Sequence, residues 1–166
     1  MMLVGGTVVT LVLVALAIAW PRLLGSESAW PMLLIAWAMT GAGYAALVTP
    51  TGRLLRRSAN ETDRPALFAA QFSLSHACWL LAYPLAGWLG AGPGLRTAVG
   101  TMACLAALGV VTAWRQWPRH DPEAVAHAHP ELPSDHPHRH AHALDEDGRH
   151  AHPYVIDDLH TRWPSH

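Results

Sequence analysis

The chain has 166 residues, of which 51% are hydrophobic and 14% charged, and its formal net charge is −1 when histidine is counted as neutral. Two cysteines, both inside apolar stretches, exclude a disulfide-stapled scaffold, and a nearly neutral chain without lysine indicates no nucleic-acid partner. Charged and apolar residues are distributed so unevenly that we predict two parts, a helical membrane region over residues 1–118 and a polar tail over residues 119–166.

Four apolar runs in the first part are each about as long as a bilayer crossing. A helix rises about 1.5 Å per residue, so roughly 20 apolar residues cross a hydrocarbon core about 30 Å thick. A soluble bundle would need polar outer faces, which the first and fourth runs lack, and no basic region marks the first run as a signal peptide. The sequence therefore predicts an all-α membrane protein with four transmembrane helices, at about residues 3–20, 29–52, 63–90 and 95–115.

Arginine is the only strongly basic residue type, and its placement predicts how the helices are oriented. Six arginines lie between the second and third helices or just after the fourth, and two lie on the opposite side. The two groups are Arg53, Arg56, Arg57, Arg64, Arg115 and Arg119 against Arg22 and Arg96. The positive-inside rule makes the arginine-rich side cytoplasmic. We therefore expect a multi-pass protein of a bacterial inner membrane, with both termini and the polar tail in the cytoplasm.

The third predicted helix has a concentration of polar side chains that the other three lack. Gln71 and Ser75 share one face, and His76 and Tyr83 follow an adjoining stripe. Polar groups at membrane depth face protein or water and avoid lipid, so we predict that these four residues line a substrate pathway. An alternative is also open at this stage, in which the same groups form hydrogen bonds between helices.

The stretch TPTGRLLRRSANETDRPALFAAQFSLSHACWLLAYPLAGWLG, from Thr49 to Gly90, resembles part of a known transporter family. It is similar to the tenth and eleventh helices of bacterial transporters of the major facilitator superfamily (MFS), and GRLLRR resembles the cytoplasmic-loop motif of that family. The resemblance implies that the four helices correspond to the ninth through twelfth crossings. Because family members have about twelve crossings in two halves, it also implies a C-terminal fragment whose partner would be the missing N-terminal half.

The polar tail holds eleven of the twelve histidines, all from His120 onward, together with nine of the twelve acidic residues and repeated prolines. This composition predicts a mostly disordered segment. Eight of the histidines form H-x-H patterns, which place alternate imidazoles on one side of an extended strand. These predicted metal ligands are His127, His129, His136, His138, His140, His142, His150 and His152.

Imidazole nitrogen suits Ni, Co and Zn ions, and the tail has no cysteine that would close a structural zinc site. We therefore predict an open chelator for several ions, with moderate affinity, poor selectivity and loss of binding below about pH 6. The alternative is a solvated tail without a metal role. Near its end, Val155, Ile156, Leu159 and Trp163 recur at near-helical spacing, which predicts one short amphipathic turn.

These features lead to two functional hypotheses. In the first, the chain is a transporter segment of MFS type that exports a divalent transition metal (Ni, Co or Zn) or another small solute, as the resemblance to histidine-tailed metal exporters implies. In the second, it is a membrane-anchored metal buffer without transport, or a non-functional truncated transporter. An enzyme is not expected, because the sequence has no nucleophile–base set, phosphate-binding loop or H-E-x-x-H pattern. No cofactor is required, and the expected partners are the lipid bilayer and the ion or solute.

Overall fold

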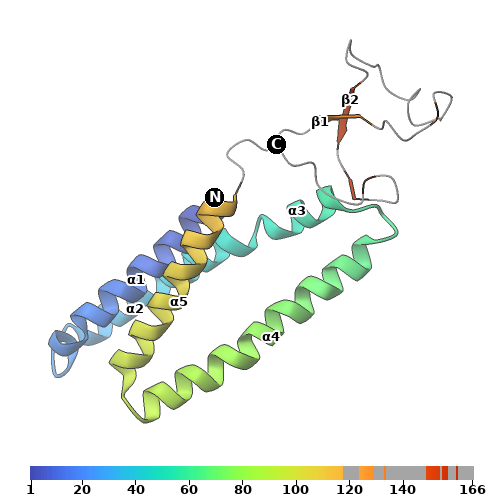
Figure 1. Cartoon of the computed structure of the whole chain (residues 1–166). Helices are drawn as coiled ribbons and strands as arrows, with labels where there is room; N and C mark the ends of the chain where they lie inside the picture. Colours follow the sequence, from blue (N-terminus) through green and yellow to red (C-terminus); the bar gives the residue numbers. More distant parts are fainter. Residues whose placement is uncertain (118–123, 129–132, 134–148, 154, 157–159, 161–166) are drawn as a thin grey trace. The chain divides into compact units, whose positions relative to one another are not determined.

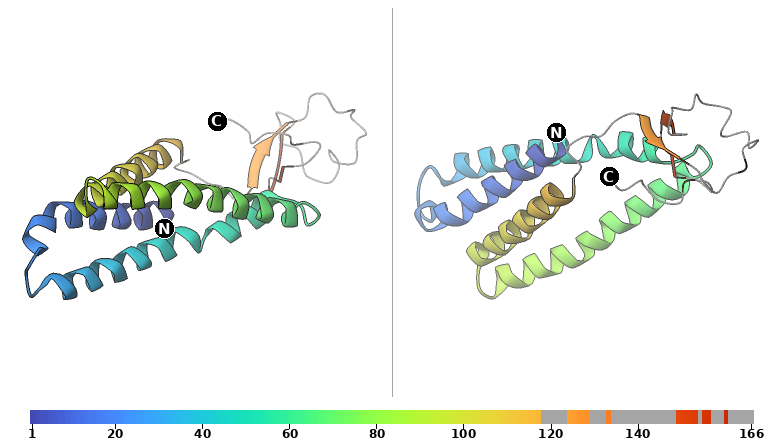
Figure 2. Two further views of the ribbon diagram at one scale, coloured as in Figure 1. Left: turned by 90° about the horizontal axis from the view of Figure 1, so that it is seen from below. Right: turned by 45° about the horizontal axis from the view of Figure 1, so that its top comes forward.

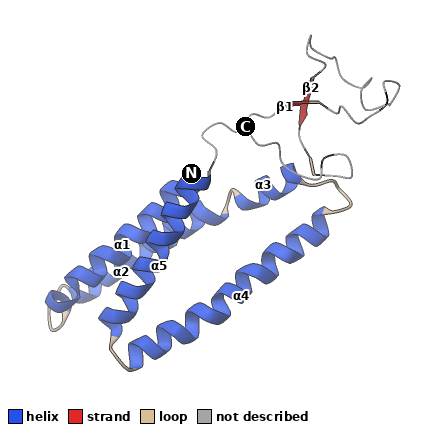
Figure 3. Cartoon of the chain, viewed as in Figure 1, coloured by secondary structure: helices blue, strands red, loops and turns tan. Residues whose placement is uncertain are grey.

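The computed structural model describes residues 1–117, 124–128, 133, 149–153, 155–156 and 160, and helices dominate this part of the chain (Figure 1, Figure 3). The elements are α1 (Met2–Leu23), α2 (Ala29–Val48), α3 (Thr51–Ser58), α4 (Arg64–Ala91), α5 (Leu95–Gln116), β1 (Ala124–His127) and β2 (His150–Pro153). The chain divides into two compact units, which are Met1–Leu54 with Phe68–Trp117, and Leu55–Leu67 with Pro118–His166.

Four helices, α1, α2, α4 and α5, are long and apolar enough to cross a membrane; for α2 this holds of the helical stretch that continues through α3. Their large apolar side chains are mostly exposed: Trp37 of α2 is 76% exposed, and Leu80 and Leu81 of α4 are each 75% exposed. A surface of this kind needs a hydrocarbon environment or a protein partner to cover it. The predicted all-α class with four transmembrane helices is therefore confirmed, and the chain is a multi-pass membrane protein.

The arginine-rich stretch after α2 forms a separate short helix, α3, where the sequence predicts the end of one helix and a polar loop. Pro50 accounts for the break, because proline has no N–H and its ring clashes with the preceding turn. The carbonyl of Pro50 accepts hydrogen bonds from the N–H groups of Arg53 and Leu54, both at 3.1 Å, and so starts the new helix. Arg53 is exposed and Leu54 is half-buried, so α3 is amphipathic.

α1 is the central helix of the first unit and packs against both α2 and α5 (Figure 2). Two adjacent buried glycines make these contacts close. A Cβ atom added to Gly5 would lie 2.5 Å from the carbonyl oxygen of Gly43 on α2, and one added to Gly6 would lie 2.9 Å from Cγ2 of Val110 on α5. Small residues let helix backbones approach closely inside a membrane, where packing contacts hold helices together.

One end of this helical unit gathers the N-terminus, the α2–α3 junction and the end of α5. Met1, Pro50, Leu54 and Trp117 line a shared pocket there. Arg115 lies in the last turn of α5, where a cation favours the negative end of the helix dipole, and Arg22 occupies the same position in α1. Because α1 and α5 run in opposite directions relative to this end, the two arginines lie at opposite ends of the helical unit.

The tail contributes a two-stranded antiparallel sheet that the sequence does not predict. β1 and β2 pair in the register Val125 with His152 and His127 with His150. Val125, His127 and His150 are buried, whereas Ala124 and Ala126 are exposed, so alternate residues form an inner face.

A further strand-like contact joins Ile156 of the tail to Ala59, which directly follows α3. The described residues Val155 and Ile156 are not helical, so the predicted amphipathic turn is not formed at these two positions. Leu159 and Trp163, the other two members of that pattern, lie outside the described residues. The N–H of Ile156 donates to the carbonyl oxygen of Ser58, the last residue of α3, and so does not take part in a helical turn of the tail.

The close crossing of α1 and α2 makes opposite predictions for two glycines of α2. We expect Gly43→Ala to destabilise the helical unit by about 1–3 kcal/mol, because its Cβ would lie 2.9 Å from both the Gly5 carbonyl oxygen and Cγ2 of Val9. Gly41→Ala is the matched control, since no atom lies within 4 Å of its Cβ and alanine is the better helix former. Thermal unfolding in detergent, followed by circular dichroism, measures both. Equal midpoints for the two variants would contradict this packing.

Candidate functional site

The polar side chains of α4 form two short networks, and the first consists of Gln71 and Ser75. The amide Nε2 of Gln71 donates to Oγ of Ser75 at 3.1 Å, and the Ser75 hydroxyl donates to the carbonyl oxygen of Gln71 at 2.8 Å. Both side chains are half-buried. The spacing of four residues places them one helical turn apart, so the helix itself supplies the geometry.

The second network is a ladder of rings along α4. The ring of His76 lies 3.9 Å from that of Phe72 and 4.7 Å from that of Trp79, and Trp79 stacks on Tyr83 at 6.0 Å. Nδ1 of His76 lies 2.8 Å from the carbonyl oxygen of Phe72, which can only accept a hydrogen bond. Nδ1 therefore carries the proton, and Nε2 remains an acceptor that is chemically able to bind a cation or a proton.

The four predicted pathway residues thus lie on one helix, and the structure joins them in two groups, Gln71 with Ser75 and His76 with Tyr83 through Trp79. Within residues 1–117, the hydrogen bonds of Gln71, Ser75 and His76 all stay inside α4. The interhelical hydrogen bonds that were left open by the sequence are therefore not formed by these three side chains in the helical unit. Tyr83 is 67% exposed, so its phenol is accessible.

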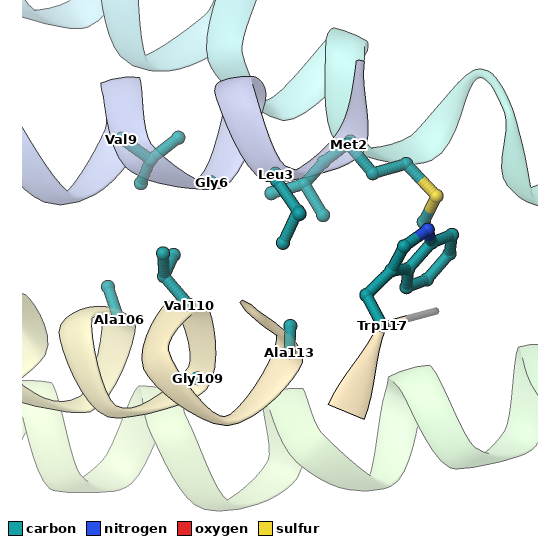
Figure 4. A pocket seen from close by; sticks show the side chains of 10 residues that line it. Met2, Leu3, Gly6, Val9, Ala106, Gly109, Val110, Ala113 and Trp117 are labelled. Carbon is teal, nitrogen blue, oxygen red and sulfur yellow. The ribbon is translucent and has the colours of Figure 1, made fainter. Parts of the chain in front are cut away.

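A separate pocket of about 330 Å³ lies between α1 and α5 (Figure 4). Leu3 and Val9 of α1 lie across it from Val110 of α5, and the indole of Trp117 lies beside Met2. Its lining has no ionisable side chain, and the indole N–H is the one polar side-chain group. Such a lining suits a hydrocarbon chain and provides no ligand for a metal ion.

A cluster of histidines forms on the inner face of the tail hairpin. His127 is its centre: its ring lies 4.5 Å from that of His150, 4.6 Å from His152 and 4.9 Å from His160. His127, His150 and His160 are 8%, 2% and 3% exposed. Alternation along the strands explains why His150 and His152 share a face with His127, because side chains two residues apart point the same way.

Three members of the cluster bring ring nitrogens close to the spacing of metal ligands. His127, His152 and His160 each offer a ring nitrogen within 4.8 Å of the other two, and Nε2 of His127 lies 3.0 Å from Nε2 of His160. Metal–imidazole bonds of about 2.0–2.1 Å hold neighbouring ligand nitrogens about 3 Å apart. Nδ1 of His127 lies 2.9 Å from the carbonyl oxygen of Val125, which makes Nε2 the lone-pair nitrogen.

The cluster overlaps only in part with the predicted ligands. His127, His150 and His152 lie within it, whereas His129, His136, His138, His140 and His142 lie outside the described residues. His160 completes the three-nitrogen group, and the sequence pattern did not single it out. It has no H-x-H partner, and only its position after the apolar residues of PYVIDDLH hints that its side chain is buried.

Comparison with known proteins places the chain in a family. The family model described as Major Facilitator Superfamily matches residues 1–152, which include all four membrane helices, β1 and all but the last residue of β2. A search of the curated proteins and a search of the solved structures each returned no match to this chain. Four membrane helices make up part of the helical bundle of such a transporter. The chain therefore belongs to the Major Facilitator Superfamily, the members of which transport small solutes across membranes.

Proposed function

We propose that this chain is part of a transporter that exports a divalent transition-metal ion from the cytoplasm across a bacterial inner membrane, and that its tail binds the same ion on the cytoplasmic side. The group formed by His127, His152 and His160 is the observation that carries the proposal. Three imidazoles without a carboxylate or thiolate among them favour Ni²⁺, Co²⁺ or Zn²⁺ over Mg²⁺ or Ca²⁺.

The geometry supports a more selective binder than an open chain of histidines. His127 and His160 are buried, and the hydrogen bond from Nδ1 of His127 to Val125 holds one ring in its binding orientation. A site of this kind loses less conformational freedom on binding than a freely moving chain does. Three ligands leave a position for water or for a group that takes over the ion, as delivery to a transporter requires.

α4 is the helix we assign to the transport pathway. Nε2 of His76 is an acceptor, and the ring ladder joins His76 through Trp79 to the exposed phenol of Tyr83. Ser75 directly precedes His76 in the chain, and Gln71 lies one turn before Ser75. Polar groups at membrane depth are costly unless they serve a polar solute or bind one another. A solute path along α4 would give these polar side chains a polar solute to contact.

Metal binding by the full chain in detergent tests the three-histidine group. We expect that replacing His127, His152 and His160 together by Asn lowers the affinity of the tightest nickel, cobalt or zinc site by about 100-fold, because the preformed ligand set is lost. Isothermal titration calorimetry at neutral pH measures the change. The matched control replaces His138, His140 and His142 by Asn and removes the same number of imidazoles. Equal losses in both variants would show an open chelator and contradict a discrete site.

Metal flux tests the pathway on α4. His76→Phe preserves the ring ladder between Phe72 and Trp79 but removes the acceptor nitrogen. If that nitrogen contributes one contact of about 1.4 kcal/mol, the apparent affinity for the transported ion falls about tenfold. Uptake of radioactive nickel, cobalt and zinc into everted membrane vesicles from cells that carry the gene measures this. Ser73→Ala, an exposed hydroxyl on the same helix, is the control. Wild-type flux that equals that of vesicles from a deletion strain would rule out metal transport.

A membrane-anchored metal buffer is the second candidate, and one observation favours it. The hydrogen bonds of Gln71, Ser75 and His76 are made inside α4, so these polar groups do not require a solute to satisfy them. A buffer would bind metal with the affinity of the intact tail and give no flux in the same vesicles. A truncated transporter without function would likewise give no flux.

A further inference from the structure

The tail segment between His152 and His160 contacts the loop that joins α3 to α4. Ile156 forms a parallel bridge with Ala59, and its backbone N–H donates to the carbonyl oxygen of Ser58 at 3.4 Å. Ala59 is only 6% exposed. Ile156 and Ala59 belong to the same compact unit as the histidine cluster. Two of the three grouped imidazoles therefore lie on either side, in sequence, of the residue that touches the loop.

We propose that a transition-metal ion bound by His127, His152 and His160 holds Ile156 against Ala59, so that metal occupancy of the tail is transmitted to the α3–α4 loop. The proposal rests on the metal binding proposed above and assigns it a second role. The ion would act as a reversible joint between the tail and the loop, in addition to being captured as cargo.

A bound ion would add to the contacts that already join these segments. Nε2 of His127 lies 3.0 Å from Nε2 of His160, and the backbone N–H of Ile156 donates to the carbonyl oxygen of Ser58 at 3.4 Å, so both contacts are of hydrogen-bond strength. Bonds from one ion to His127, His152 and His160 would hold these residues together more firmly than hydrogen bonds do. Ile156 lies between His152 and His160 in the sequence, so the ion would also restrain Ile156 at Ala59.

The position of Ala59 allows the restraint to reach a membrane helix. The next residue, Asn60, accepts hydrogen bonds through its carbonyl oxygen from the N–H groups of Asp63 and Arg64, both at 3.1 Å. Arg64 is the first residue of α4 and also pairs with Glu61 at 3.5 Å. A restraint at Ala59 therefore acts one residue before the turn that starts α4, the helix that carries His76. A higher concentration of the metal ion in the cytoplasm would thereby make the α3–α4 loop less mobile.

Hydrogen–deuterium exchange of the full chain in lipid nanodiscs tests the joint, with zinc as the probe. We expect saturating zinc to slow exchange in a peptide that covers residues 55–63 by about fivefold. Ile156→Pro removes the N–H that donates to Ser58 and keeps all three histidines, so its loop should exchange at the zinc-free rate. Ile156→Val keeps the N–H and the β-branched side chain, and it should behave as the unchanged chain does. Calorimetry on the same samples reports zinc binding.

The possible results separate the joint from the metal binding on which it rests. The joint is supported if all three proteins bind zinc, Ile156→Pro at most about fivefold more weakly as reciprocal coupling requires, and only Ile156→Pro loses the loop protection. Zinc binding at the three-histidine site with no change in loop exchange, or with equal protection in Ile156→Pro, would overturn the joint and leave the metal site intact. Failure of the unchanged chain to bind zinc would overturn both proposals. His160→Gln is a second probe, because it keeps Ile156 and removes one ligand, and retained loop protection in this variant would also overturn the joint.

Discussion

The contact of two adjacent glycines on α1 with two different helices determines the geometry of the membrane unit. Gly5 meets the backbone of Gly43 on α2, and Gly6 meets the side chain of Val110 on α5, so α1 is in close contact with a neighbouring helix on two sides. In a bilayer the lipid tails are as apolar as leucine, so burial of apolar surface does not drive helices together as it does in water. Close van der Waals packing takes that role, and it depends on the absence of side chains at these crossings.

The same reasoning explains the different character of α4. Most of its side chains are exposed, and the close pairs of helices in the described chain are α1 with α2 and α1 with α5. Its polar and aromatic side chains are ordered along the helix by bonds and ring contacts within α4 itself. A helix that satisfies its own polar groups can present them to a solute path without relying on a neighbour for their orientation. The ordering of polar groups within α4 is therefore compatible with the solute transport that is typical of the family.

Sequence reasoning predicts the membrane helices well because run length and the absence of charge are local properties. It fails where the determining contact is distant in the chain. The hairpin pairs His127 with His150 across an intervening stretch of tail, and His160 approaches His127 from 33 residues away. Alternation of histidines predicts that His150 and His152 share a face of a strand, but it carries no information about which strand lies opposite. α3 was missed for another reason, because GRLLRR reads as a charged loop until Pro50 is recognised as the start of a new helix.

The break at Pro50 has a consequence for the level at which charge meets the bilayer. The 20 residues of α2 correspond to about 30 Å of helix, which equals the thickness of a hydrocarbon core. Had the helix run unbroken through α3, its guanidinium groups would have been fixed on a rigid rod. The break instead separates the apolar α2 from the basic α3, in which Arg53 is exposed and Leu54 lines the pocket that it shares with Met1 and Trp117. A proline in the middle of an apolar-to-basic transition thus ends the membrane-spanning length of α2 before the arginines of α3 begin.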